Sequence, residues 1–133
     1  MVVDTSALMA IFFDEPDAAE FEDAIDADPA RLISMGTVLE CSIVLEARFG
    51  EAGVRELDYL LHRLSFTSIP VDGEQMEWGR LAFRNFGKGR HRAGLNFGDC
   101  FAYALSKTSG EPLLFKGSDF SLTDIPAVRS SPR

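Results

Sequence analysis

Four acidic residues fall where a metal-dependent reaction could be organised. Asp4 and Asp119 each follow a short apolar run, whereas Glu40 and Asp99 lie within helical patterns. Carboxylates that converge in one pocket repel one another and become protonated unless a cation holds them. Oxygen ligands without histidine or cysteine select Mg²⁺ or Mn²⁺, and a water bound to such an ion can attack a phosphodiester. The four acids therefore indicate a hydrolytic site for phosphodiesters.

Each acid, taken singly, also has a structural explanation. Asp4 is a favoured helix cap, and Asp119 a favoured turn residue. Asp99 would lie in the first turn of a helix, where it complements the helix dipole. Glu40 follows Thr37 by three residues, which is typical of a capping box. On a helix, Glu40 would also share a face expected to point inward, made of Ile43, Val44 and Ala47.

One dense basic run precedes Asp99 and suggests a contact with phosphate. It contains Lys88, Arg90 and Arg92 between glycines. Guanidinium groups bind phosphate oxygens through paired hydrogen bonds, so this run is a candidate substrate-binding loop. The alternative is a solvated loop without function. Five phenylalanines lie at helical spacing, so we expect them to pack in the core and not to stack on bases. They are Phe12, Phe21, Phe49, Phe83 and Phe101.

The elements that must position these residues alternate between strand and helix. Alternation of this kind predicts an α/β fold with a parallel sheet covered by helices on both faces. Pro70 predicts an edge position for the third strand. Ligands of such sheets bind beyond the carboxyl ends of the strands, where Asp4 and Asp119 fall. The expected strands are 1–3, 32–34, 66–71, 112–115 and a weak 125–128, and the expected helices are 6–13, 16–26, 35–49, 54–64, 74–86 and 95–109.

Length and composition are those of one globular domain spanning residues 1–133. Apolar residues make up 46% and charged residues 26%, and the net charge is 13 − 21 = −8. Such a charge should repel a polyanion. However, residues 1–60 carry 14 acids and 3 bases, whereas residues 61–133 carry 7 acids and 10 bases. No signal-peptide pattern or membrane span opens the chain, so we expect a cytoplasmic protein without a membrane partner.

In order and spacing, these motifs resemble the PIN-domain ribonucleases and, within them, the VapC toxins of bacterial toxin–antitoxin pairs. The resemblance covers essentially the whole chain. It rests on the sequence VVDTSAL at residues 2–8, Glu40, the run GKGRH at 87–91, LNFGDC at 95–100 and PLLFKGSDF at 112–120. No single motif decides it, but together they are specific. The resemblance implies a sheet of order 3-2-1-4-5 and a Mg²⁺-dependent endoribonuclease.

The resemblance also implies roles for individual residues. Asp4 and Asp99 would be the metal ligands. Ser6 would support the site and take part in substrate binding. Asp124 competes with Asp119 for the role of the fourth acid. A homodimer and a cognate VapB-type antitoxin, whose C-terminal segment blocks the acidic pocket, are further implications. The implied catalytic quartet is Asp4, Glu40, Asp99 and Asp119.

Two other functions fit parts of the pattern. A receiver-like phosphoacceptor domain shares the length, the sheet and an acidic magnesium site, and Asp72 would be its acceptor. An inactive PIN module that only binds other proteins is the second alternative, although the full acidic quartet argues against it. A surplus of acids at residues 14–23 is a candidate surface for a basic antitoxin segment: Asp14, Glu15, Asp17, Glu20, Glu22 and Asp23.

Overall fold

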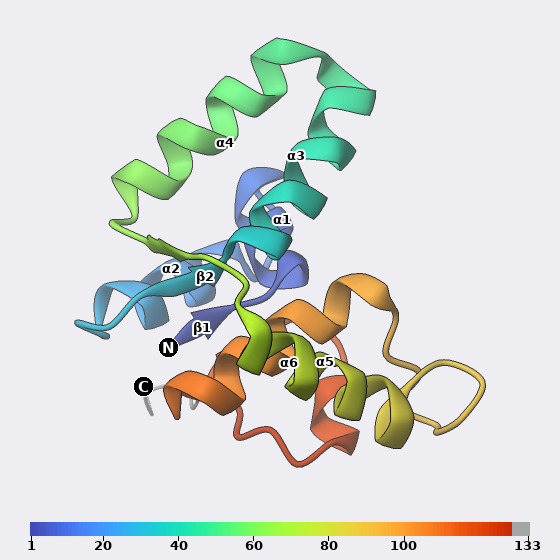
Figure 1. Ribbon diagram of the computed structural model, residues 1–133. Helices are drawn as coiled ribbons and strands as arrows, with labels where there is room; N and C mark the ends of the chain where they lie inside the picture. The colour runs from blue at the N-terminus through green and yellow to red at the C-terminus, as the bar shows by residue number, and fades with distance from the viewer. Residues whose placement is uncertain (129–133) are drawn as a thin grey trace.

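A parallel sheet lies at the centre of the fold, with its strands in the order β3-β2-β1-β4 (Figure 1). The computed structural model describes residues 1–128, so residues 129–133 of the expected domain lie outside the described residues. The α/β class and this strand order confirm the prediction. In place of the expected fifth strand, Ala127 forms one parallel bridge with Leu113. The strands are β1 (Val2–Val3), β2 (Leu32–Ser34), β3 (Thr67–Ile69) and β4 (Leu113–Leu114).

Helices connect the parallel strands, because each parallel pair needs a crossover. Figure 1 shows α1 to α4 on one side of the sheet and α5 and α6 on the other. Helix α2 begins at Ala18, so Pro16 precedes its first turn instead of lying within it. The helices are α1 (Thr5–Phe12), α2 (Ala18–Asp26), α3 (Met35–Phe49), α4 (Glu51–Arg63), α5 (Gly73–Phe86) and α6 (Phe97–Ser109), and a short 3₁₀ helix, η1, spans Phe120–Leu122.

The two faces of the sheet support two apolar clusters, as the alternation of side chains along a strand requires. Val3 and Leu114 pack with the side chains of α1 to α4. Their neighbours Val2 and Leu113 point the other way and pack with α5 and α6. The short strands β1 and β4 are therefore buried on both sides, and their ends are fixed in position.

Helix α3 does not begin with the predicted capping box. Its N-cap is Ser34, whose side chain accepts a hydrogen bond from the backbone N–H of Gly36 at 3.1 Å. Thr37 is buried inside the helix, so it cannot act as the cap. The carboxylate of Glu40 is consequently free to contact another element.

The apolar face expected around Glu40 is largely exposed, because the buried stripe of α3 lies on a different side. Ile43 is 59% exposed and Val44 is 44% exposed. Phe49 and Phe83, which we expected in the core, are 49% and 42% exposed. A helix turns about 100° per residue, so only one stripe of four-residue spacing faces the core. That stripe consists of Thr37, Cys41 and Leu45.

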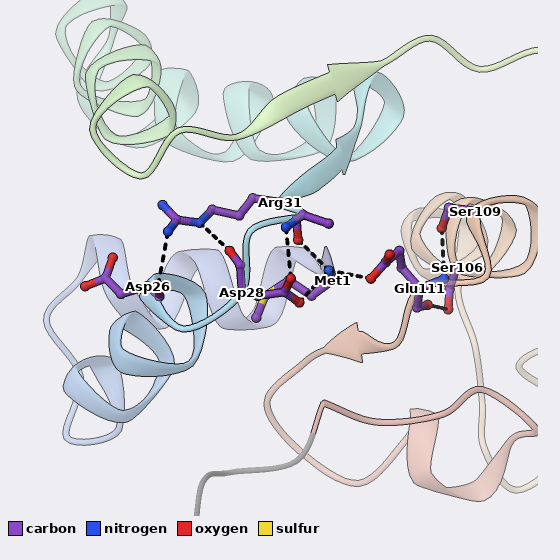
Figure 2. Close-up of polar contacts among 8 residues, drawn as sticks. Met1, Asp26, Asp28, Arg31, Ser106, Ser109 and Glu111 are labelled. Carbon is purple, nitrogen blue, oxygen red and sulfur yellow. Dashed lines mark hydrogen bonds and ion pairs between the residues drawn. The ribbon is translucent and has the colours of Figure 1, made fainter.

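Ion pairs hold the amino ends of the central strands together (Figure 2). The α-amino group of Met1 donates to carboxylate oxygens of Asp28 and Glu111, both at 2.8 Å, and to the carbonyl oxygen of Ala30. The Nε–H of Arg31 donates to the carbonyl oxygen of Asp28 at 2.9 Å. Burial acts to raise the pKa of Asp28, but the bonds from the α-amino group and the Ala30 N–H, with the nearby positive charges, lower it.

No helix within residues 1–128 combines the length and the apolar character that a membrane span needs.

Candidate active site

Asp4 lies at the carboxyl end of β1, where it is only 3% exposed. Its Oδ2 atom accepts hydrogen bonds from the backbone N–H of Ser6 at 3.0 Å and from the Ser6 hydroxyl at 2.6 Å. The Ser6 hydroxyl oxygen accepts the N–H of Lys116 at 2.9 Å, which ties the loop after β4 to this point. Burial raises the pKa of Asp4, and repulsion from Glu40 adds to the rise, while the Ser6 hydrogen bonds oppose it. Asp4 thus caps α1 and presents a costly buried carboxyl group, with Ser6 fixing its orientation.

Glu40 reaches from α3 toward the first turns of α1 and α6. The hydroxyl of Thr5 donates a short hydrogen bond to its Oε1 atom. Its Oε2 atom lies directly over Gly98, where an added Cβ would be only 1.6 Å away. A side chain at position 98 would therefore displace the carboxylate. Thr5 and Gly98 together determine where Glu40 lies.

Asp99 occupies the first turn of α6 in the predicted capping arrangement. The backbone N–H of Asp99 donates to Asn96 Oδ1 at 3.0 Å, and the N–H of Asn96 donates to Asp99 Oδ2 at 2.9 Å. Burial raises the pKa of Asp99 to about 6, and repulsion from Asp4, Glu40 and Asp119 contributes to the rise. Because such repulsion falls off with distance, all four acids of the predicted quartet lie in one region.

Asp119 and Asp124 differ in their surroundings. Asp119 is exposed at the start of η1 in the loop that follows β4, and its charge acts on Asp99. Asp124 instead accepts hydrogen bonds from the Tyr103 hydroxyl at 2.8 Å and from Lys107 Nζ at 2.7 Å. Burial acts to raise the pKa of Asp124, but the bonds from Lys107 and Tyr103 lower it. This geometry favours Asp119 as the fourth acid.

No basic side chain neutralises the quartet within residues 1–128, where none of its members forms an ion pair. The nearby Lys116 directs its Nζ atom to Glu15 and Asp17 instead, at 2.6 and 3.2 Å. In the same part of the chain, no group of three or more Asp, Glu, His or Cys side chains is arranged so that it could hold a metal ion. Mg²⁺ commonly takes only one or two carboxylates, together with waters and substrate phosphate. Asp4 and Asp99 are the two acids of the quartet whose pKa values are raised, which makes them the candidates for such a pair.

The basic loop, residues 87–93, joins α5 to the segment before α6 and is held by its own backbone. The N–H of Lys88 donates to the carbonyl oxygen of Leu95, and the N–H of Leu95 donates to that of Phe86, both at 2.9 Å. Gly89 has a φ of +83°, a conformation that favours glycine. The loop is therefore a defined turn and not a loose connection.

The side chains of the basic loop divide into exposed and packed ones. Lys88, Arg90 and Arg92 are exposed, as a phosphate-binding role requires. His91 is half-buried, its Nδ1 atom accepts the N–H of Ala93 at 3.0 Å, and its ring packs edge-on against Phe86. His91 therefore stabilises the turn, whereas the other three side chains stay available to a ligand.

Comparison with known proteins identifies the family. The PIN-domain family model matches residues 1–126. Ribonuclease VapC of Mycolicibacterium smegmatis is 60% identical over 128 residues, which cover 96% of this chain and 99% of that protein. Ribonuclease VapC30 of Mycobacterium tuberculosis is 58% identical over 128 residues, covering 96% and 98%. The chain belongs to the VapC ribonuclease family of PIN-domain proteins.

Solved structures of more distant proteins share this PIN fold. The crystal structure of Mycobacterium tuberculosis VapC20, described as a toxin that cleaves the sarcin–ricin loop, has a TM-score of 0.74 at 17% identity and covers 96% of this chain and 98% of its own. A toxin–antitoxin complex from Klebsiella pneumoniae has a TM-score of 0.65 at 20% identity, covering 90% and 89%. At these identities the likeness shows the fold alone.

Membership of the PIN family removes the basis for the receiver-like alternative. Its candidate acceptor, Asp72, caps α5 by accepting a hydrogen bond from the N–H of Gln75 at 2.9 Å. Sequence reasoning also missed two residues that shape this PIN site, Thr5 and Gly98. Both lie inside motifs that carried the resemblance, next to Asp4 and Asp99, but only the fold shows that both face Glu40.

Proposed function

We propose that this chain is the toxin of a type II toxin–antitoxin system and acts as a metal-dependent endoribonuclease in the cytoplasm. The observation that carries the proposal is a quartet of acids with no basic partner within residues 1–128, in a VapC-family chain. Unpaired buried carboxylates are costly, and groups with raised pKa values concentrate at functional sites. A divalent cation, Mg²⁺ or Mn²⁺, would offset that cost.

In this proposal each acid has a distinct task. Asp4 and Asp99 would hold the cation, which would lower the pKa of a bound water and offset charge on the phosphate. Ser6 keeps Asp4 in position, and Thr5 does the same for Glu40. Glu40 Oε2 would take the proton of the attacking water as the water oxygen bonds to phosphorus, and the ribose oxygen whose bond to phosphorus breaks would take a proton from solvent. Lys88, Arg90 and Arg92 hold phosphates of the RNA beside the cleaved bond.

Cleavage of total RNA by the purified protein tests the activity. We expect cleavage with Mg²⁺, none with EDTA, and a loss of at least about 100-fold for Asp4→Asn or Asp99→Asn. Asp58→Asn is the matched control, because it removes one exposed acid of α4 and should leave the rate unchanged. Cleavage that persists both in EDTA and in the two site variants would refute the metal-dependent mechanism.

We further propose an antitoxin that binds the acidic surface at residues 14–23. Part of that surface is neutralised within the chain, because Lys116 pairs with Glu15 and Asp17, and Arg63 pairs with Glu22 at 3.4 Å. Glu20 remains exposed on α2. Growth arrest upon expression should be relieved by co-expression of the neighbouring open reading frame.

A charge reversal on α2 then tests where the antitoxin binds. Glu20→Lys should weaken binding of the antitoxin, whereas Glu74→Lys on the exposed side of α5 should not. Equal effects of the two changes would place the antitoxin elsewhere. No relief of growth arrest by the neighbouring frame would contradict the antitoxin proposal itself.

We also propose a homodimer that buries the exposed side of α3. Met35, Leu39 and Ile43 follow one another at four-residue spacing and are 48%, 61% and 59% exposed. An uncharged apolar stripe can meet a second copy of itself across a two-fold axis. Light scattering should give twice the chain mass for the wild type and the single mass for Leu39→Glu. Tyr59→Glu, on the 63% exposed Tyr59 of α4, is the control that should stay dimeric.

A further inference from the structure

A cavity surrounded by arginines lies beside the last turns of α5. Its volume is about 310 Å³, and its lining consists of Arg80, Phe83, Arg84 and Arg90. We call it the arginine cavity. Of these residues, only Arg90 is a substrate contact predicted from the sequence, and Phe83 was expected in the core. The structure instead leaves Phe83 42% exposed at the wall of this cavity.

The guanidinium groups of the arginine cavity are only partly committed to other contacts. Arg90 lies over the ring of Phe83, with 5.4 Å between the guanidinium carbon and the ring centroid. Arg80 pairs with Glu77 at 2.9 Å, but both side chains are more than 60% exposed, so water weakens that pair. Arg84 forms no ion pair within residues 1–128. Three arginines thus line the cavity together with Phe83, and within residues 1–128 only Arg80 among them forms an ion pair with an acid.

A second cavity shares part of its wall with the arginine cavity and extends to the first turn of α6. Helices α5 and α6 lie side by side and meet at the basic loop (Figure 1). The cavity between them, of about 360 Å³, shares Arg80 and Phe83 with the arginine cavity and extends to Phe97 and Cys100. Phe97 and Cys100 flank Asp99 in the first turn of α6. The two cavities therefore share a wall, and the second one extends along α6 to residues that neighbour Asp99 in sequence.

We propose that the arginine cavity binds one nucleotide of the RNA substrate outside the cleaved bond. The backbone phosphate lies against Arg84 and Arg90, and the base lies on the face of Phe83. Arginine forks match phosphate oxygens, and aromatic rings stack on bases of any sequence, so the pair of contacts fits single-stranded RNA. This inference rests on the proposed ribonuclease activity, and it adds Arg80, Phe83 and Arg84 to the candidate substrate contacts.

Local charge supports RNA over an uncharged occupant. The whole chain has a net charge of −8, so a polyanion needs a region where that charge is reversed. The arginine cavity supplies such a region, and a bound cation would partly neutralise the acids of the quartet. The exposed Phe83 could also pack against a second copy of the chain. Such a contact would not explain why three arginines line the cavity.

Binding of labelled RNA to a protein that cannot cleave it tests the proposal. The full chain with Asp99→Asn is titrated, in EDTA, into a fluorescein-labelled single-stranded RNA of random sequence, and anisotropy gives Kd at several salt concentrations. Adding Arg84→Gln should raise Kd about fivefold to tenfold and reduce the slope of log Kd against log salt by ~0.7, the value for one phosphate contact. Adding Phe83→Leu should raise Kd by a similar factor without changing the slope.

The control and the alternatives keep the test decisive. Arg55→Gln removes the same charge from an exposed arginine of α4, 72% exposed, and should change Kd less than twofold. If Arg84→Gln behaves like Arg55→Gln, the proposal is wrong. If Phe83→Leu or Arg84→Gln separates a dimer in light scattering and RNA affinity falls only in the separated species, a second copy occupies the cavity and the proposal is also wrong.

The same measurements separate this proposal from the proposed function. RNA binding that depends on Arg84, in a protein whose wild type cleaves no RNA, would support the cavity and contradict the ribonuclease activity. If the wild type cleaves RNA but RNA binding does not depend on Arg84, the ribonuclease activity is supported and the cavity proposal is contradicted. Arg84→Lys, which keeps the charge but loses the fork, should give an intermediate Kd if phosphate geometry matters.

Discussion

Acidic side chains gather at both edges of the same parallel sheet, and the two groups differ in their counter-charges. At the amino edge, Asp28 and Glu111 bind the α-amino group of Met1, and the pKa of Asp28 is lowered. At the carboxyl edge, Asp4 and Asp99 have no basic partner within residues 1–128, and their pKa values are raised. The paired acids stabilise the fold. The unpaired acids cost stability, which is expected where a site is built to receive a cation.

Among the changes that compare the two edges, the largest effect is expected from a methyl group at Gly98. Gly98→Ala would place a Cβ 1.6 Å from Glu40 Oε2, so the carboxylate must leave its position beside Asp99. Loss of a positioned group next to a metal ligand typically costs about 10-fold to 100-fold in metal affinity or activity. We expect RNA cleavage to fall by that factor, with a parallel loss of Mn²⁺ affinity in a direct titration.

Two matched variants show whether the loss arises from Glu40. Gly73→Ala places a methyl group on another helix, where nothing lies within 4 Å, and should leave cleavage unchanged. Glu40→Ala removes the obstructing carboxylate, so adding Gly98→Ala to it should cost no further thermal stability. A further loss in that background would mean that Gly98 is needed for a reason unrelated to Glu40.

The pH dependence of cleavage should reflect the ionisation of Asp99 at the carboxyl edge. Metal binding requires the ionised carboxylate, and the pKa of Asp99 is raised to about 6 by burial and by repulsion from the other acids. We expect cleavage to rise about tenfold per pH unit up to pH ~6 and then to level off. Rates measured between pH 5 and 8 at a Mg²⁺ concentration well below saturation test this, because saturating metal would itself favour the ionised carboxylate and move the rise to lower pH. A rate that stays flat through pH 6 would contradict the role of Asp99.

Stability of the metal-free protein should depend on pH with opposite sign at the two edges. An unfolded carboxyl group has a pKa of about 3.9, so between pH ~4 and ~6 folded Asp99 keeps a proton that the unfolded chain releases. Its contribution to stability therefore falls as the pH rises. Asp28 has a lowered pKa, so its contribution is present above pH ~4 and is lost in acid.

Thermal melting at pH 7 without metal compares the two edges directly. Asp99→Asn should raise the midpoint by a few degrees, because it removes a disfavoured charge and keeps an oxygen that can accept the Asn96 N–H. Asp28→Asn should lower the midpoint by a few degrees, because it weakens the pairing with the α-amino group. If both changes shift the midpoint in the same direction, the two edges do not differ as described.

A smaller effect is expected at the fourth acid, where an unpaired and a paired carboxylate can be compared. Asp119 raises the pKa of Asp99 and has no cation partner among residues 1–128, whereas Asp124 accepts hydrogen bonds from Lys107 and Tyr103. Asp119→Asn should slow cleavage about fivefold with little change in melting. Asp124→Asn should leave cleavage within about twofold and lower the melting midpoint. The reverse pattern would assign the fourth role to Asp124.

Much of this contrast could be predicted from the sequence, because the site residues follow local patterns. The alternation of strands and helices placed Asp4 and Asp119 at the carboxyl edge, and the bounds of α3 follow from its pattern and Gly50. The capping arrangement of Asn96 and Asp99 is equally local. Strands and helices repeat every two or 3.6 residues along the sequence, so they can be predicted without knowing the fold.

The contacts that failed to be predicted join segments far apart in the chain. The hydrogen bond from Thr5 to Glu40 spans 35 residues, and the approach of Glu40 to Gly98 spans more. The capping box at Thr37 was wrong because Ser34, at the end of β2, caps α3 first. Phe83 was placed in the core because periodicity gives the spacing of a stripe but not which side of α5 the rest of the fold covers.

The smallest expected effect concerns Lys116, the one basic residue that the loop after β4 brings near the site. Its Nζ atom pairs with Glu15 and Asp17, and its backbone N–H, which a substitution keeps, supports Ser6. Because the side-chain pairs are exposed, Lys116→Met should change cleavage less than twofold and melting only slightly. Comparing Lys116→Met with Asp99→Asn shows whether the positive charge of Lys116 already stabilises the acids at the carboxyl edge. A tenfold loss of cleavage would mean that Lys116 leaves its partners to act on the substrate, and the carboxyl edge would then not be free of protein cations during the reaction.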